Sequence, residues 1–299
     1  MVFAIAFLSL CGGSRGQDLR ITQGLVDHQV LQRGSGNSAD LRISGLAADA
    51  EGRNVEARIL DKGIEVAGFP WSSIARVERG TWSGQVGRIP AGGPYRLELR
   101  VAGSAHSRTV EDVLVGDLWV LGGQSNMEGC GNLENVEAPH PLVHNFDLTD
   151  QWLVAQEPLH RLIDAVDPVH WDGKPRIQGA ELQQAVAKIW RGTGVGLPFA
   201  VEMVRRTGVP VGLIPCAHGG STMNQWDPRL KDKGGNSLYG SMLRRVRATG
   251  GKVAGVLWYQ GESEAFPAAV SEFQPKFENR TIFINEFLQS SCWYLILDI

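Results

Sequence analysis

The chain of 299 residues has an ordinary globular composition, with 43% hydrophobic and 20% charged residues, and is long enough for one large or two medium domains. Its formal net charge of −3 gives no general electrostatic reason to expect a nucleic acid or an anionic membrane as partner. The one basic cluster, Arg244, Arg245 and Arg247, is short, and we expect it to form a solvated helix face.

Residues 1–17, MVFAIAFLSLCGGSRGQ, predict a signal peptide. An apolar run over residues 2–10 is followed by small and polar residues, and the run is too short to span a bilayer. We therefore expect a secreted or periplasmic protein with no integral membrane segment after signal removal. Lipidation at Cys11 is the alternative, which Leu10 disfavours because a small residue usually precedes a lipidated cysteine.

The cysteines that remain after signal removal are Cys130, Cys216 and Cys292. Their number is odd, and no two of them have the C-x-x-C spacing. This pattern predicts neither a disulfide framework nor a zinc site. We expect no metal and no cofactor.

Residues 18–112 have the pattern of β-strands. The segments LRISG, NVEARIL and YRLELRV alternate apolar and polar residues, and turn-forming clusters such as RGSGNSAD and PAGGP separate them. Short strands with turns at this spacing predict a small antiparallel β-sandwich as a lead-in domain.

From residue 113 to residue 277, strand-like runs alternate with helical stretches. This alternation predicts an α/β domain with a parallel sheet. Strand-like runs end in polar, glycine-bearing loops at residues 122–129, 217–224 and 259–264. In a parallel sheet these loops emerge at one edge, so we expect them to form a single site.

The three loops contain the components of a serine hydrolase. Ser125 lies after a strand and supplies its own N–H, and Gly219 and Gly220 leave a second backbone N–H unobstructed. Gln260 offers an amide donor, and Glu262 offers a carboxylate that could orient a histidine. Each piece also has a structural interpretation: Ser125 as a helix N-cap, the glycines as a plain turn, and Glu262 as a helix N-terminal acid.

The motifs GGQSNMEG, IPCAHGGSTMNQW and GVLWYQGESEA, in this order and spacing, resemble those of the sialate O-acetylesterase-like carbohydrate esterases, within the SGNH or GDSL-like hydrolases. The resemblance runs from about residue 21 to residue 265. It implies a three-layer α/β/α SGNH-hydrolase-like domain that removes O-acetyl groups from carbohydrates such as sialic acid or xylan, without a metal. It implies Ser125 as nucleophile, Ser125, Gly220 and Gln260 as oxyanion donors, and Glu262 as the residue that orients the base.

The end of the chain departs from this family. Members have a late D-x-x-H block whose histidine is the general base, whereas no histidine follows His218 here. We therefore expect residues 113–277 to be an incomplete catalytic domain and residues 278–299 an atypical tail, from truncation or a shifted reading frame. His218, and His170 in the D-x-x-H-like segment DPVH, are the remaining candidates for the base. The alternative function is a truncated or degenerate, non-catalytic carbohydrate-binding relative.

Overall fold

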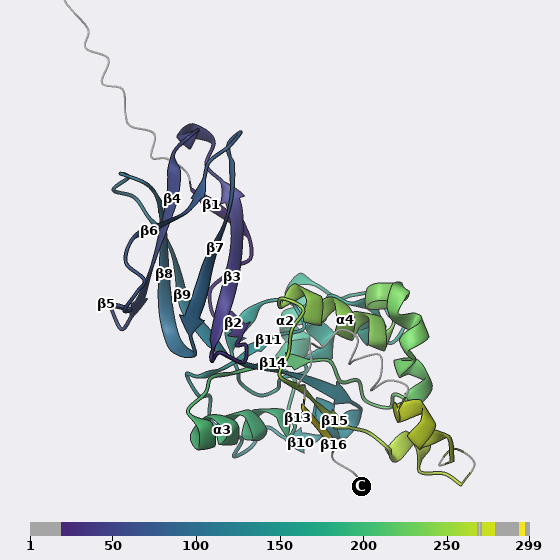
Figure 1. Cartoon of the computed structure of the whole chain (residues 1–299). Coiled ribbons are helices and arrows are strands. Elements are labelled where there is room, and N and C mark those ends of the chain that lie inside the picture. Colours follow the sequence, from purple (N-terminus) through teal and green to yellow (C-terminus); the bar gives the residue numbers. More distant parts are fainter. Residues whose placement is uncertain (1–18, 268, 270, 279–292, 297–299) are drawn as a thin grey trace, which may run out of the picture.

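The computed structural model describes residues 19–267, 269, 271–278 and 293–296. The predicted signal peptide, residues 1–17, lies outside the described residues, as does most of the predicted tail, residues 278–299. The protein has a mixed α/β fold with a large mixed sheet, which confirms the predicted α/β class (Figure 1). Among the described helices, none has both the length and the apolar character needed to cross a membrane.

The elements follow one another along the chain as strands first and as alternating strands and helices later. The strands are β1 (Arg20–Gln23), β2 (Val30–Gln32), β3 (Ser38–Leu46), β4 (Asn54–Asp61), β5 (Ile64–Glu65), β6 (Ser72–Arg76), β7 (Thr81–Pro90), β8 (Gly92–Val101), β9 (Arg108–Gly123), β10 (Gly131–Asn132), β11 (Val143–Phe146), β12 (Trp152–Val154), β13 (Arg191–Thr193), β14 (Val211–Pro215), β15 (Gly255–Tyr259) and β16 (Trp293–Ile296). The α-helices are α1 (Ser125–Glu128), α2 (Gly179–Val186), α3 (Gly196–Thr207) and α4 (Leu238–Ala248). The 3-10 helices are η1 (Ala48–Ala50), η2 (Leu162–Asp164), η3 (Pro168–Trp171), η4 (Met223–Trp226), η5 (Pro228–Asn236) and η6 (Glu262–Glu264).

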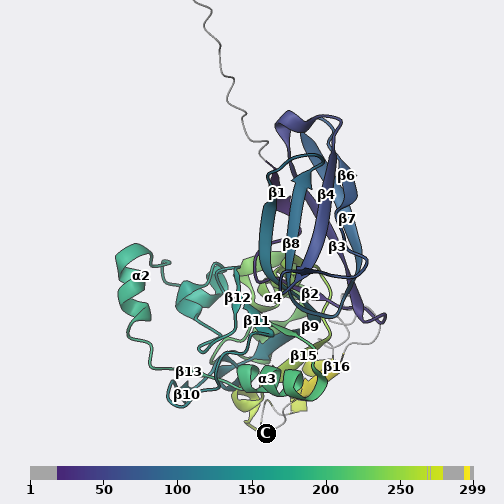
Figure 2. The same cartoon turned by 90° about the vertical axis from the view of Figure 1, so that its left-hand side faces the viewer.

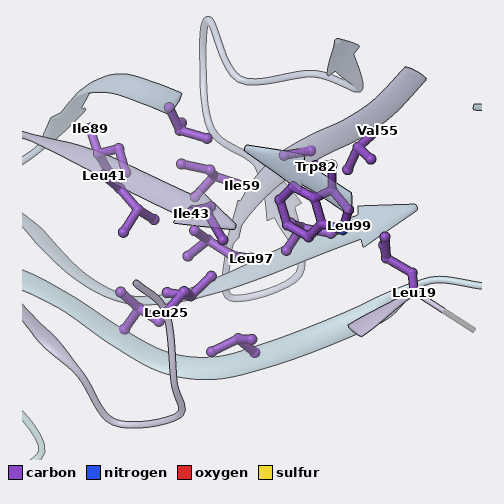
Figure 3. Close-up of a cluster of buried hydrophobic side chains, with 14 of the residues drawn as sticks. Leu19, Leu25, Leu41, Ile43, Val55, Ile59, Trp82, Ile89, Leu97 and Leu99 are labelled. Carbon is purple, nitrogen blue, oxygen red and sulfur yellow. The ribbon is translucent and has the colours of Figure 1, made fainter. Parts of the chain in front are cut away.

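The N-terminal third consists almost entirely of antiparallel strands. Strands β1, β3 and β7 form one sheet, while β4 pairs with β5, β6 and β8 in another. Apolar side chains from both sheets meet in one buried cluster, in which Figure 3 labels Leu41, Ile43 and Trp82 from the first sheet and Ile59 and Leu97 from the second. The alternating sequence pattern produces this arrangement because every second side chain of a strand points to the same face.

The long strand β9 connects the two regions of the chain. Its first part pairs antiparallel with β8, and its second part pairs parallel with β14 and β15 (Figures 1 and 2). The predicted boundary between residues 112 and 113 therefore falls inside one strand. Asp112, at φ +55°, marks an irregular point in β9 at this position. The division into two domains stays a prediction.

The second part of β9 lies in the middle of a parallel arrangement in the order β11, β14, β9, β15, β16. Leu118 and Val120 belong to an apolar cluster with α4, and Trp119 and Leu121 belong to another with α3. Because both faces of the strand are covered, its residues form a continuous buried run instead of an alternating one. Helix α3 ends at Gly208 in the left-handed conformation, as its sequence predicts.

The basic cluster of α4 is not a solvated face, which corrects the sequence-based expectation. Arg245 is completely buried; it is 2.9 Å from Asp150 Oδ1, and it donates to the Phe146 carbonyl. Arg244 is half-buried and pairs with Asp150 and Asp167, and only Arg247 is exposed. The sequence pattern shows three like charges but not the acidic partners, which come from segments about 80 to 95 residues earlier.

Candidate active site

The three loops named from the sequence meet at one edge of the parallel strands. β14 and β15 flank β9 on either side, in a parallel register that pairs Leu121 with Pro215 and Gly123 with Tyr259. All three strands therefore end at the same edge of the sheet, with the end of β14 lying two residues before the ends of β9 and β15. The residues that follow them, including Ser125, come together as the sequence predicts.

Ser125 is the first residue of the single-turn helix α1, directly after the tight turn at Gly123 and Gln124. Gly123 has φ +128°, and a Cβ there would lie 2.1 Å from the Tyr259 carbonyl oxygen, so only glycine fits. As the first helical residue, Ser125 has an N–H without an acceptor inside the helix. Its hydroxyl makes no hydrogen bond within the part of the chain that the structure describes.

The loop after β15 holds the other two loops together. Ser263 N–H donates to Gln124 Oε1 at 3.2 Å, which joins this loop to the turn before Ser125. Gln260 is buried, and its Nε2 donates to the Ser221 carbonyl at 2.9 Å. Glu264 accepts the Met223 N–H at 2.5 Å, which adds a second link to the loop after β14.

Two of the predicted oxyanion donors keep hydrogens available. Gly220 lies in the left-handed region at φ +70°, and its N–H has no hydrogen-bond partner among the described residues. A side-chain amide nitrogen carries two hydrogens, so Gln260 retains one after its bond to Ser221. The buried Gln260 Oε1, by contrast, has no hydrogen-bond partner in the described structure.

Glu262 contacts Asn126 and no histidine. Its Oε1 accepts a hydrogen bond from Asn126 Nδ2, and its Oε2 accepts the Gly261 N–H at 3.1 Å. The carboxylate therefore fixes the residue next to Ser125. The predicted role of Glu262 in orienting a histidine stays a prediction, because no hydrogen bond joins it to an imidazole ring in the described part of the chain.

His218 and His170 form a pair beside the loop after β14. Their Nδ1 atoms are 3.1 Å apart, and His218 Nε2 lies 3.2 Å from Asp172 Oδ1. A carboxylate only accepts, so His218 carries its proton on Nε2, and its Nδ1 accepts from His170. This tautomer leaves the buried His170 Nε2 as an acceptor without a partner among the described residues.

Both ring nitrogens of His218 are thus engaged, and Ser125 Oγ bonds to neither histidine. Burial and, to a smaller extent, the neighbouring His218 lower the pKa of His170 to about 3, so this ring is neutral at ordinary pH. Asp167, which has the D-x-x-H spacing to His170, pairs with Ser241 and Arg244 and not with the histidine. The assignment of either histidine as general base stays a prediction.

Glu128 is a residue of the site that the sequence reasoning did not identify. Its Oε2 accepts the Gly219 N–H at 2.5 Å, which connects α1 to the loop after β14. Burial raises the pKa of Glu128, the Gly219 hydrogen bond opposes that shift, and the charge of Asp172 adds to it. The signal in the sequence was its position three residues after Ser125, since residues three apart share one side of a helix.

Comparison with known proteins decides the family. The model of a family described as carbohydrate esterase, sialic acid-specific acetylesterase, matches residues 115–289, which is more than half of the chain. The chain belongs to this family. The match includes all three loops of the site and excludes nearly all of the N-terminal antiparallel strands. Members of the family are hydrolases of ester bonds, so the predicted resemblance is confirmed.

The chain is also similar to two proteins of the same kind. A probable carbohydrate esterase of Arabidopsis thaliana is 29% identical over 168 residues, which are 49% of this chain and 54% of that protein. The crystal structure of a carbohydrate acetylesterase from Xanthomonas citri superposes with a TM-score of 0.56 at 24% identity, over 93% of this chain and 60% of that one. The chain thus spans a little over half the length of these relatives, and the second likeness shows the fold alone.

Proposed function

We propose that the protein is a serine esterase that removes O-acetyl groups from carbohydrates, with Ser125 as nucleophile. The supporting observation is the meeting of the Ser125 turn, the Gly219–Gly220 turn and the Gln260–Glu262 turn at one sheet edge, held by cross-loop hydrogen bonds. Family membership supports the acetylated carbohydrate as the substrate class. We propose a sialate or xylan acetate as the substrate.

In the proposed reaction, Ser125 Oγ attacks the acetyl carbonyl carbon and loses its proton to a base. The carbonyl oxygen becomes an oxyanion, which the N–H groups of Ser125 and Gly220 and the Gln260 amide stabilise. The carbon–oxygen bond to the sugar then breaks, and the sugar oxygen takes up the proton. Water hydrolyses the acetyl-serine by the same steps and releases acetate.

The rate of ester hydrolysis by this chain depends on the base that accepts the Ser125 proton. A serine hydroxyl is a weak nucleophile at neutral pH unless a base accepts its proton. His218 and His170 bond to each other, and His218 also bonds to Asp172. We therefore propose that turnover is slow in this arrangement and that Ser125 is nevertheless the group that reacts.

The finer structural and cellular assignments belong to the same proposal. We propose that the strands of residues 18–112 form a β-sandwich domain of their own, followed by a three-layer α/β/α SGNH-like domain. The apolar clusters on both faces of β9 support the three layers. The apolar start of the chain supports secretion or export to the periplasm.

The test measures acetate released from acetylated xylan and from O-acetylated sialic acid, with and without added imidazole as a soluble base. We expect slow release that imidazole accelerates, and a loss of at least about tenfold in both conditions for Ser125→Ala. Ser73→Ala, an exposed serine of β6, is the matched control and keeps the full rate. Equal rates for the parent chain and Ser125→Ala would contradict the assignment of Ser125.

A further inference from the structure

The carboxylate of Glu128 joins the nucleophile turn to the loop after β14. Glu128 is the last residue of α1, and its own N–H donates to the Gln124 carbonyl at 2.9 Å, which fixes its backbone. Its side chain reaches across to Gly219, whose N–H donates to Oε2 at 2.5 Å. The two residues are 91 positions apart in the sequence, so this bond is a tertiary contact between two of the three site loops.

The contact lies beside the nucleophile. A Cβ built at Gly219 would be 2.9 Å from Glu128 Oε2 and 3.7 Å from the Cβ of Ser125. Position 219 is therefore in contact with both residues at once. A side chain at this position would displace the Glu128 carboxylate, which is the flexible end of its side chain.

The bond also decides which backbone N–H of the glycine pair remains available. Gly219 N–H is used by Glu128, whereas Gly220 N–H, the next along the chain, has no partner among the described residues. Gly220 has φ +70°, with no atom within 4 Å of an added Cβ, so the turn is open on its outer side. The bond holds the peptide plane between His218 and Gly219, and the Gly220 N–H belongs to the next plane, which is separated from it by the two dihedral angles of Gly219. The bond therefore anchors the start of the turn that carries the Gly220 N–H.

We propose that Glu128 is a positioning residue of the esterase site: by accepting the Gly219 N–H, it holds the loop after β14 so that Gly220 presents its N–H to the oxyanion formed at Ser125. This inference rests on the proposed function. Glu128 acts through Gly219 and does not touch the reacting atoms. The titratable groups that contact this loop include Asp172, which pairs with His218 at 3.2 Å, and Glu264, which accepts the Met223 N–H. His160 contacts the Glu128 backbone.

The experiment compares Glu128→Ala and Glu128→Gln in the full chain, using acetate release with imidazole present. Glu128→Ala removes the acceptor, and we expect kcat to fall by about 10–100-fold with KM within about twofold, because a misplaced oxyanion donor weakens only transition-state binding. The glutamine amide oxygen can accept the same N–H, so Glu128→Gln should recover kcat to within about threefold of the parent chain. Glu202→Ala is the matched control, at a half-buried glutamate of α3 that pairs with Arg205 and Arg206.

A further measurement separates positioning from a purely structural role. Amide exchange at Gly219 should accelerate in Glu128→Ala and stay slow in Glu128→Gln. A kcat for Glu128→Ala equal to that of the control, or a glutamine variant as slow as alanine, would overturn the proposal. If the parent chain shows no Ser125-dependent release, the proposed function fails, while the exchange measurement still decides whether Glu128 holds Gly219.

Discussion

At the scale of single residues, Gly219 and Gly220 are adjacent and yet have different requirements. A methyl group at Gly219 would meet the Glu128 carboxylate at 2.9 Å, whereas a methyl group at Gly220 would meet nothing within 4 Å. Gly220 has a left-handed backbone, which costs an L-residue about 1–2 kcal/mol. Glycine is needed at one position for space and at the other for conformation.

We predict that Gly219→Ala lowers kcat by about tenfold, because it displaces Glu128, with little change in the free energy of unfolding. Gly220→Ala retains its backbone N–H, and we expect a loss of about 1–2 kcal/mol in stability with a smaller effect on kcat. Urea unfolding and acetate release on both variants check this pair of outcomes. The reverse pattern, in which Gly220→Ala loses activity and Gly219→Ala loses only stability, would contradict the assignment.

The sequence could predict that the loops of Ser125, Gly220 and Gln260 lie together, because each residue belongs to a short motif at the end of a strand. It could not predict the bond between Glu128 and Gly219, since that contact depends on how two loops 91 residues apart approach each other. The pairing of His218 with His170 is hidden for the same reason, with 48 residues between them. Local patterns locate the site, and tertiary contacts determine the state of its side chains.

At the scale of elements, the sequence pattern predicted the antiparallel strands of residues 18–112 and the alternation of strands and helices after residue 113, but not how β9 connects the two regions. The prediction divided the chain at residue 113, where the composition changes, although β9 runs from Arg108 to Gly123 without a break. Residues 108–112 are mostly exposed or half-buried. Residues 113–123 are buried except for the half-buried Asp117, because apolar clusters cover both faces of the strand there. A change in the sequence pattern marks a change of environment, and here the strand itself continues.

Helix α4 is anchored to the sheet edge by a buried charge, which leads to an element-scale prediction. Arg245 pairs with Asp150 and is completely buried, so Arg245→Ala leaves a partly buried carboxylate with one partner fewer. We expect a loss of about 3–5 kcal/mol for this variant, and a change within about 0.5 kcal/mol for the exposed Arg247→Ala. Urea denaturation of both variants measures this difference. Equal stabilities would mean that the pair contributes no more than a surface ion pair.

At the scale of the whole molecule, buried titratable groups link stability to pH. Burial lowers the pKa of His160 and of His170 to about 3, so both are neutral in the folded protein while their unfolded forms titrate near 6.5. Glu157 has the opposite effect. Burial raises the pKa of Glu157 to about 6. The residue lines a cavity of about 250 Å³ beside β11 and β12. Its carboxylate accepts hydrogen bonds from the backbone N–H groups of Leu159 and Gly194.

The signs of these contributions follow from proton linkage. Below pH 6.5 the unfolded histidines bind protons that the folded ones exclude, so each costs about 2 kcal/mol of stability by pH 5. Glu157 is harder to ionise in the folded state, so its penalty is present above pH 6 and diminishes toward pH 4.5, which returns about 1 kcal/mol at pH 5. The two histidines outweigh Glu157. Burial also raises the pKa of Glu128 and lowers the pKa of His144, and these two shifts act on stability in opposite directions.

We therefore predict that the free energy of unfolding falls by roughly 3 kcal/mol between pH 7.5 and pH 5. Urea unfolding at the two pH values measures this loss, and two variants assign it. His170→Gln removes one of the titrating rings, so its loss should be about 2 kcal/mol smaller than that of the parent chain. Glu157→Gln removes the opposing contribution of Glu157. The free energy of unfolding of this variant should therefore fall by about 1 kcal/mol more than that of the parent chain between the two pH values. A parent chain that is equally stable at both pH values, or more stable at pH 5, would show that the two imidazoles are not excluded from protons in the folded state.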